Sequence, residues 1–332
     1  MLRIFHNTSY DFIRPWRIMV ALTVGFIVIG LGDLAIRGIR YSIDFTGGTI
    51  MQLRFKQPPD VSRLRSLLDK GGVHNAEIQS FGSNREYTVR AQDVAARAES
   101  GTGSTDSVSL QVRTILNSAF DSTQYQVVRA ESVGPRVGNE LRTGAIKAIL
   151  FSFVLTLLYL AWRFEWRFGV AAVVATAHDI CTTMAFIKLM NLEVSLTVVA
   201  AILTVIGYSL NDTIIIFDRV RENLRRRRRE PLYDTLNRSV NETLPRSVMT
   251  HATAFAATLA LLIFAGEVIR PFAWVMAFGI VTGTFSSIYV AAPVLLWIER
   301  RWPREISTAQ GGPAMKKPAP RPQKPKETAG VR

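Results

Sequence analysis

The sequence has few of the residues on which metal sites and disulfide frameworks are built. Among 332 residues there are one cysteine and four histidines. The single thiol, Cys181, excludes an intramolecular disulfide, and it does not reveal the redox compartment. The sequence also lacks a Gly-Lys-Ser/Thr phosphate-binding loop, a nucleophile elbow, a catalytic triad and a metal-hydrolase signature. We therefore expect no enzymatic activity, no cofactor and no bound metal.

Acidic residues are scarce relative to basic ones. The chain has 26 Asp and Glu against 40 Lys and Arg, which gives a net charge of +14. Nucleic-acid-binding proteins share such an excess, but the arginines at 225–229 directly follow an apolar run, and further basic residues lie in a Pro/Lys-rich tail. This is the positive-inside distribution of membrane proteins, which also favours contact with anionic lipid headgroups. We expect membrane lipids, and no specific nucleic acid, as partners of these charges.

Six long apolar runs exclude a soluble protein. Each is close to the roughly 20 helical residues needed to cross a hydrocarbon core. Gly32, Asp33 and Arg37 close the first run, and no small-x-small cleavage site follows, which favours a retained helix over a signal peptide. The runs predict a polytopic α-helical membrane protein with six transmembrane helices, and they lie at 18–34, 143–162, 168–190, 194–217, 247–266 and 272–298.

The basic residues predict the orientation of these helices. They precede the first run, occupy the alternate short connections and fill the tail, so both termini are expected in the cytoplasm. The resulting boundaries are a cytoplasmic N-terminus at 1–15, a first helix at 16–37, helices two to six at 140–302, a basic cytoplasmic loop at 218–246, and a disordered cytoplasmic tail at 303–332.

The remaining segment, 38–139, is predicted to form an extracytoplasmic domain between helices one and two. Residues 49–56 alternate apolar and polar side chains as a strand does, and Asp60 is a good N-cap for the helical pattern after it. Two strands joined by a turn at 82–84, a second helix and a last strand at 125–130 follow. The order βαββαβ predicts a ferredoxin-like α/β domain.

Polar and ionisable residues interrupt the third, fourth and fifth runs. An ionisable group at the bilayer centre costs at least ~2.5–3.5 kcal/mol, so it usually faces a bundle interior and serves a purpose. The third run holds His178 and Asp179, the fourth holds Asn211 and Asp212, and Arg246 opens the fifth.

Asp212 is the leading candidate for a working group, with Arg246 as its expected partner. Burial favours the neutral form of a carboxyl group and a nearby arginine favours the charged form, so such a pair can load and release a proton. The alternative is a permanent pair that only holds helices together. Protons are the expected coupling ion, because the carbonyl-rich broken helices of many sodium sites are missing; sodium stays an open alternative.

Other residues have supporting roles. His178 and Asp179 are adjacent on a helix and point about 100° apart, which disfavours a shared metal ion; they form either a hydrogen-bonding pair or part of the proton path. Thr250, which follows Arg246 on the same helix face, and Asn211, which precedes Asp212, are further candidates for support of the proton path. A small-x-x-x-small seam, made by Gly279 and Gly283, predicts close helix packing.

Several strings resemble the SecD/SecF family of bacterial protein-export membrane proteins, a branch of the resistance-nodulation-division superfamily. The layout of one span, an external domain and five spans agrees with the half-repeat of that superfamily. The strings are DFTGG at 44–48, SVGP at 132–135, HDI at 178–180, GYSLNDT at 207–213, FDRVREN at 217–223 and TGTFSS at 282–287.

The resemblance implies a subunit that pairs with SecD in the bacterial inner membrane. The pair would use the proton-motive force to assist late steps of preprotein export through the SecYEG channel, with YajC or YidC as further partners. The family's proton-transport carboxylate falls on Asp212 and its arginine on Arg246. Two other functions stay open: a half-size efflux subunit for a small hydrophobic molecule or lipid, and a structural scaffold.

One string departs from the family pattern. Where the family often has Thr-Ser-x-Thr-Thr after the arginine, this chain has THATA at 250–254. Two hydroxyls are lost and His251 is gained. His251 either substitutes for a hydroxyl or adds a titratable group to the proton relay.

Overall fold

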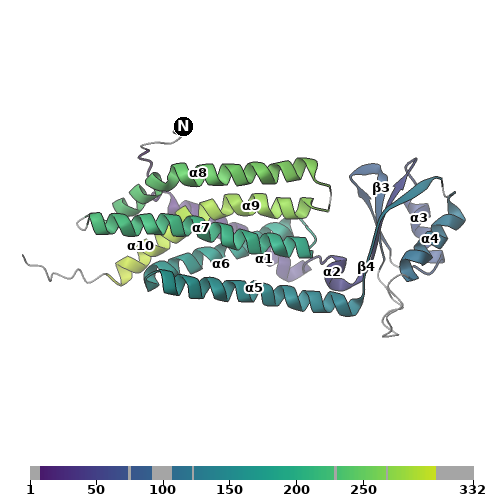
Figure 1. Ribbon diagram of the computed structural model, residues 1–332, viewed down its shortest axis with the longest axis horizontal. Helices are drawn as coiled ribbons and strands as arrows, with labels where there is room; N and C mark the ends of the chain where they lie inside the picture. Colours follow the sequence, from purple (N-terminus) through teal and green to yellow (C-terminus); the bar gives the residue numbers. More distant parts are fainter. Residues whose placement is uncertain are drawn as a thin grey trace, which may run out of the picture.

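The computed structural model describes residues 8–73, 76–91, 107–121, 123–227, 230–266 and 268–303. The expected C-terminal tail lies, apart from Pro303, outside the described residues. A long helical bundle carries a small α/β domain at one end (Figure 1). We refer to the two ends of the bundle as the domain end and the far end.

Six helical segments of the bundle are long and apolar enough to cross a membrane, as the sequence predicts. The sixth is composite, because a π-helical turn interrupts it. The segments are α1 (Trp16–Arg37), α5 (Pro135–Arg163), α6 (Trp166–Leu189), α7 (Leu196–Arg226), α8 (Leu232–Phe264) and the run formed by α9 (Arg270–Ser286), η2 (Ser287–Ala291) and α10 (Ala292–Arg301).

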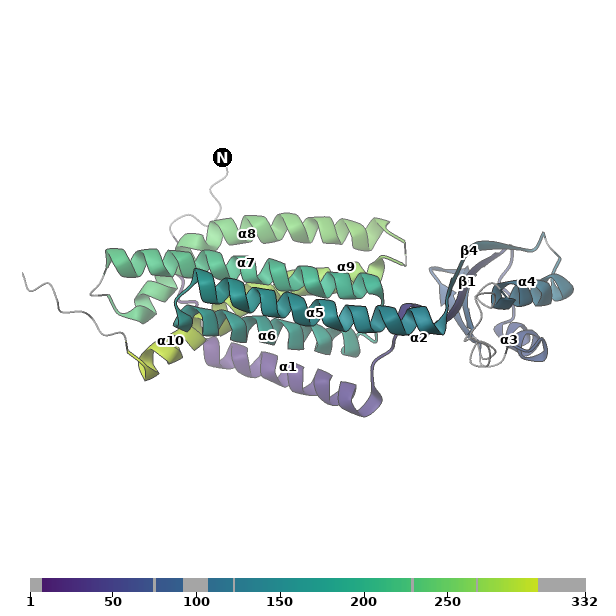
Figure 2. The ribbon, with the colours of Figure 1, turned by 60° about the horizontal axis from the view of Figure 1, so that its bottom comes forward.

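The interior of the bundle is formed by α6, α7 and the sixth segment, while α1, α5 and α8 lie around them (Figure 2). Small residues let the inner helices approach closely. A methyl group added at Gly279 would lie 2.2 Å from Val205 Cγ2, and one at Gly283 would lie 2.9 Å from Ser209 Cβ. The α9–α7 contact therefore requires glycine at both positions, as packing between membrane helices often does.

The basic segment after the fourth span is not the loop expected at 218–246. Helix α7 continues to Arg226 and α8 begins at Leu232, so most of this segment is helical. Ion pairs hold the charged part of α7 against its neighbours, with Arg163 Nη2 2.8 Å from Asp218 Oδ2 and Arg219 Nε 2.6 Å from Glu242 Oε2. Hydropathy predicts only where the apolar run ends. The helix can continue beyond that point, because its backbone hydrogen bonds form within the helix whatever the polarity of the side chains.

The α/β domain has the predicted ferredoxin-like order. A four-stranded antiparallel sheet with strand order β2-β3-β1-β4 packs its apolar face on two helices, and its core includes Met51, Leu64 and Leu116. Asp60 caps the first of them by accepting from Ser62 N. The elements are β1 (Gly48–Phe55), α3 (Val61–Lys70), β2 (Glu77–Phe81), β3 (Ser83–Ala91), α4 (Ser107–Ala119) and β4 (Tyr125–Val133).

The domain is seated on the bundle at both of its chain connections. The short helix α2 (Ile43–Thr46) leads from α1 into β1, and β4 runs almost directly into α5. Gly47 has a φ of 72°, and a methyl group on it would lie 2.9 Å from Pro135 Cα. A methyl group on Gly138 would lie 2.9 Å from Gly47 N. Glycine at these positions allows the turn after α2 to contact the start of α5 directly.

Candidate functional site

Asp212 lies in the interior of the bundle, 3% exposed, on the face of α7 that meets α8. Ser247 Oγ on α8 donates a hydrogen bond of 2.5 Å to Asp212 Oδ1. The other oxygen, Oδ2, has no hydrogen-bond partner, and no lysine or arginine in the described ranges forms an ion pair with this carboxyl. Within the described ranges the site is therefore a buried carboxyl group with a hydroxyl donor and without an ion-paired lysine or arginine.

Arg246 does not occupy the expected place beside Asp212. It precedes Ser247 on α8 and its side chain is exposed. Successive residues of an α-helix point about 100° apart. The orientation of α8 about its axis that directs Ser247 toward α7 therefore directs Arg246 away from it. The prediction that Arg246 contacts Asp212 is therefore wrong. Ser247 was not predicted, because a single serine in an apolar run does not by itself indicate a functional residue.

His251 is the titratable residue that does lie near Asp212. It follows Ser247 by one helical turn, is 8% exposed and interacts electrostatically with the carboxyl. Its ring packs edge-on against Tyr208 of α7, with centroids 5.3 Å apart, and its Nδ1 has no hydrogen-bond partner. The Tyr208 hydroxyl donates to the Thr250 carbonyl at 3.0 Å, while the Thr250 side chain is exposed. Tyr208 and His251 thus line the α7–α8 contact beside the carboxyl.

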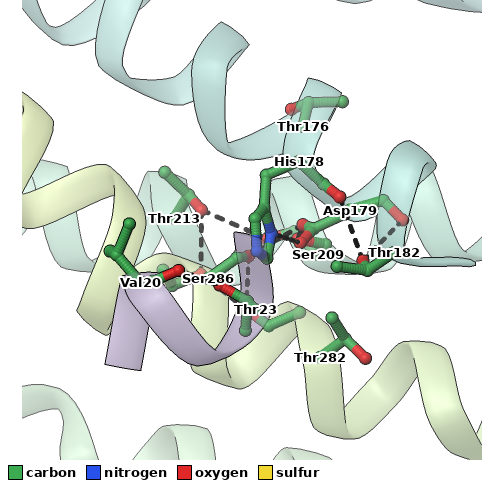
Figure 3. Close-up of polar contacts among 12 residues, drawn as sticks. Val20, Thr23, Thr176, His178, Asp179, Thr182, Ser209, Thr213, Thr282 and Ser286 are labelled. Atoms are coloured by element: carbon green, nitrogen blue, oxygen red, sulfur yellow. Dashed lines mark hydrogen bonds and ion pairs between the residues drawn. The ribbon is translucent and has the colours of Figure 1, made fainter. Parts of the chain in front are cut away.

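Asp179 is a second buried carboxyl group, 1% exposed, on α6 (Figure 3). Its Oδ2 accepts hydrogen bonds from Ser209 of α7 and from Ser286 of α9, the latter at 2.7 Å. Its Oδ1 lies 3.1 Å from His178 Nδ1. The His178 ring stacks near Phe285, and its Nε2 has no hydrogen-bond partner. Side chains of three helices thus meet at this carboxyl group. His178 and Asp179 form a hydrogen-bonding pair, which is one of the two alternatives that the sequence predicts.

Hydroxyl groups connect the surroundings of the two carboxyl groups. Thr213 follows Ser209 by one turn on α7, and its Oγ1 lies 2.8 Å from Ser287 Oγ. Ser287 is adjacent to Ser286 and begins the π-helical turn η2. Such turns occur often at functional sites. A buried band of polar side chains therefore lies between α6, α7 and the junction of α9 with η2, and its member Thr213 is next to Asp212 in α7.

The other candidate residues fall outside this band. Asn211 is exposed, because it points away from the face that carries Asp212. Gly279 and Gly283 lie where α9 crosses α7, next to Val205 and Ser209. In the part of the chain that the structure describes, no cluster of three or more His, Cys, Asp or Glu side chains could hold a metal ion. The band can instead donate, accept and hold protons.

Comparison with known proteins decides the family. The model described as "Protein export membrane protein SecD/SecF, C-terminal" matches residues 111–301, and that of the "SecD/SecF GG Motif" matches residues 34–59. The chain belongs to the SecD/SecF family. The first SecD/SecF match contains every buried polar residue described above, and the second contains α2 and its glycine turn.

Individual members of the SecD/SecF family are similar over most of the chain. A Protein translocase subunit SecF of Gemmatimonas aurantiaca is 60% identical over 92% of this chain and 91% of its own length. That of Desulfurispirillum indicum is 41% identical over 88% and 92%. The crystal structure of SecDF, a translocon-associated membrane protein from Thermus thermophilus, superposes with a TM-score of 0.78 at 37% identity, covering 89% of this chain. This chain spans only 39% of that SecDF chain.

Proposed function

We propose that this chain is the SecF-type subunit of a SecDF complex that uses the proton-motive force to assist late steps of protein export through SecYEG. Support comes from the relatives named translocase subunits and from the translocon-associated structural neighbour. The chain matches 39% of that neighbour, and SecD is the proposed partner that would supply the rest. The translocating preprotein is the cargo, and YajC or YidC are further candidate partners.

The observation that carries the proposal is Asp212, a buried carboxyl group inside a membrane-crossing helix that forms no ion pair with any described lysine or arginine. A charged carboxylate is expensive in a medium of low polarity, and protonation removes that cost. When Asp212 gains a proton on Oδ2, which has no partner among the described residues, that oxygen becomes a donor that needs an acceptor, while Oδ1 can still accept from Ser247. The proton therefore changes the charge and the hydrogen-bonding demand of the group at the α7–α8 contact.

The energy available is sufficient for a conformational switch. A proton that moves down the membrane field releases ~2.3 kcal/mol per 100 mV, which biases a two-state equilibrium more than about tenfold. Coupling to sodium would use the same carboxyl group. Export driven by a proton gradient or by a sodium gradient distinguishes the two ions.

The proposed orientation places the α/β domain, about 38–139, in the periplasm. The basic far end, which includes Arg167, Arg225 and Arg301, then faces the cytoplasm of a bacterial inner membrane together with both termini. The domain would stand where an emerging polypeptide leaves the membrane.

A small hydrophobic cargo is less compatible with the domain. An open hollow of about 660 Å³ in its described part is lined by Arg54, Lys56, Arg85, Glu86 and other polar residues, with the aromatic Phe55 and Tyr125 among them. Pockets for apolar small molecules are lined mainly by apolar side chains. Export of a polypeptide therefore agrees better with this surface than efflux of a lipid-like molecule.

The test is export in vesicles that contain this chain, SecD and the translocon. With an imposed proton gradient, Asp212→Asn should reduce gradient-stimulated export at least about tenfold and abolish proton uptake. The matched control is Asn211→Ala, which changes the adjacent, exposed residue and should leave both unchanged. Normal gradient-stimulated export by Asp212→Asn would refute the proposal, and stimulation by a sodium gradient alone would reassign the ion.

A further inference from the structure

The α/β domain also contacts the beginning of α7, the helix that carries Asp212. Arg90, at the end of β3, makes the main side-chain contacts. Its Nη2 donates to the Tyr41 carbonyl at 2.7 Å and lies 3.2 Å from Thr46 Oγ1. Its Nη1 lies 3.4 Å from Glu193 Oε1, in the connection between α6 and α7. An arginine of the domain thus reaches the segment that leads into α7.

The same connection is held by a second arginine and by backbone bonds. Arg40 Nη2 lies 3.2 Å from Glu193 Oε1, so two guanidinium groups share one carboxylate. Ser42 N donates to the Val194 carbonyl at 2.9 Å, and Val194 N donates to the Arg40 carbonyl at 2.8 Å. The chain between α1 and β1 therefore pairs with the chain between α6 and α7 as a short parallel bridge.

Asp44 completes the contact at the first residue of α7. Its Oδ2 accepts a hydrogen bond of 2.9 Å from Leu196 N. The first backbone N–H groups of a helix have no partner within it, and a carboxylate there is stabilised by the helix dipole. We call this set of contacts the α7 joint: Arg40, Asp44, Arg90, Glu193 and the backbone of residues 41, 42, 194 and 196.

Helix α7 connects the joint to the buried carboxyl group without interruption. Leu196 and Asp212 are 16 positions apart in one α-helix, which is about 24 Å at 1.5 Å per residue. The other seat of the domain, where Gly47 meets Gly138, lies on α5, which contributes no residue to the buried polar band. A displacement of α7 at the α7–α8 contact would therefore reach the domain along α7, through the α7 joint and the adjoining contact of Phe45 with the start of α7.

We propose that the α7 joint transmits the movement that follows protonation of Asp212 to the α/β domain, with Arg90 and Glu193 as positioning residues. The proposal rests on the proposed proton-driven export function. It assigns the joint a role in coupling and none in proton transfer. Breaking the joint should uncouple proton transfer from export. Protons should still pass, but the proton gradient should no longer stimulate export.

The experiment measures proton uptake and preprotein export in the same vesicles, with SecD and the translocon present. Arg90→Gln and Glu193→Gln break the joint from its two sides, and Glu193→Asp keeps the charge. The control is Arg54→Gln, which removes an ion pair of the same sheet, with Glu86 at 2.8 Å, away from the joint. The amount of each variant in the membrane and its co-purification with SecD are recorded.

Both glutamine variants should keep proton uptake within about twofold of the parent chain and lose at least about fivefold in gradient-stimulated export, a typical size for a coupling energy. Glu193→Asp should recover most export, and Arg54→Gln should change neither quantity. Normal export in both glutamine variants would overturn the proposal. Equal loss of proton uptake and export would also overturn it, because the joint would then only support the bundle. If Asp212→Asn exports normally in this series, the proposed function itself fails, whatever the joint variants do.

Discussion

Ser247 on α8 donates a hydrogen bond of 2.5 Å to Asp212 on α7, and both side chains are buried. The bond ties the protonation state of the carboxyl group to the position of α8. Pro245 lies two residues earlier inside the same helix. Proline has no N–H group and removes one i→i−4 bond, so α8 is easier to bend beside the carboxyl than elsewhere. The α7–α8 contact is thus where the proposed proton-driven change of helix packing would begin.

Ser247→Ala should weaken both the fold and export. The carboxyl group would lose its hydroxyl donor in the interior, which costs about 1–3 kcal/mol of unfolding free energy. Gradient-stimulated export should fall several-fold, while Ser247→Thr, which keeps a hydroxyl, should retain most of it. Denaturant unfolding of the purified chain and vesicle export measure the two effects. Thr253→Ala is the control, since that exposed hydroxyl bonds only within α8; an equal loss there would contradict the prediction.

Arg246→Gln should lower export without changing the stability of the isolated chain. The residue is exposed and has no ion pair with Asp212, so its removal should change the unfolding free energy by no more than about 0.5 kcal/mol. The resemblance to the family nevertheless implies a role in proton transport, which would require another conformation or the SecD partner. The unfolding free energy of the chain alone measures the effect on stability, and vesicle export with SecD present measures the effect on function. A large loss of stability in the isolated chain would contradict this account.

Gly279→Ala should destabilise the bundle by about 1–3 kcal/mol, as overpacking of an interior does. The added methyl group would lie 2.2 Å from Val205 Cγ2, so α9 and α7 must separate. Gly144→Ala is the matched control on α5, where no atom lies within 4 Å, and it should be neutral or stabilising. Adding Val205→Ala to Gly279→Ala should recover part of the loss. The cycle is measured by the unfolding free energies of the parent chain, Gly279→Ala, Val205→Ala and the double variant. If the double variant recovered no stability, the clash would not be with Val205.

Asp179→Ala should be the most destabilising of these substitutions. It leaves donors from Ser209, Ser286 and His178 facing an empty space, at a cost of about 2–5 kcal/mol. Asp179→Asn keeps an acceptor oxygen and should cost less. Asp234→Ala removes an exposed carboxylate from the first turn of α8 and serves as the control. A loss for Asp179→Ala no larger than for Asp234→Ala would mean that the cluster contributes nothing to the packing of α6, α7 and α9.

Much of the architecture was predictable, because it depends on local composition. The six spans follow from the length of apolar runs, and the βαββαβ order follows from alternation, helical spacing and the cap at Asp60. The same local reading failed at 218–246, where the apolar run ends but α7 continues to Arg226 and α8 already begins at Leu232.

The sequence by itself determined which buried carboxyl groups this chain has, since Asp179 and Asp212 stand out against their apolar neighbours. Only the tertiary structure decided what surrounds them: Ser247 in place of Arg246 at Asp212, and two serines from different helices at Asp179. It also decided the α7 joint between residues 90 and 193, which lies at the other end of α7. These contacts depend on how each helix is rotated about its axis. That rotation is set by close packing of many side chains, such as Gly279 on Val205, and no single stretch of sequence contains it.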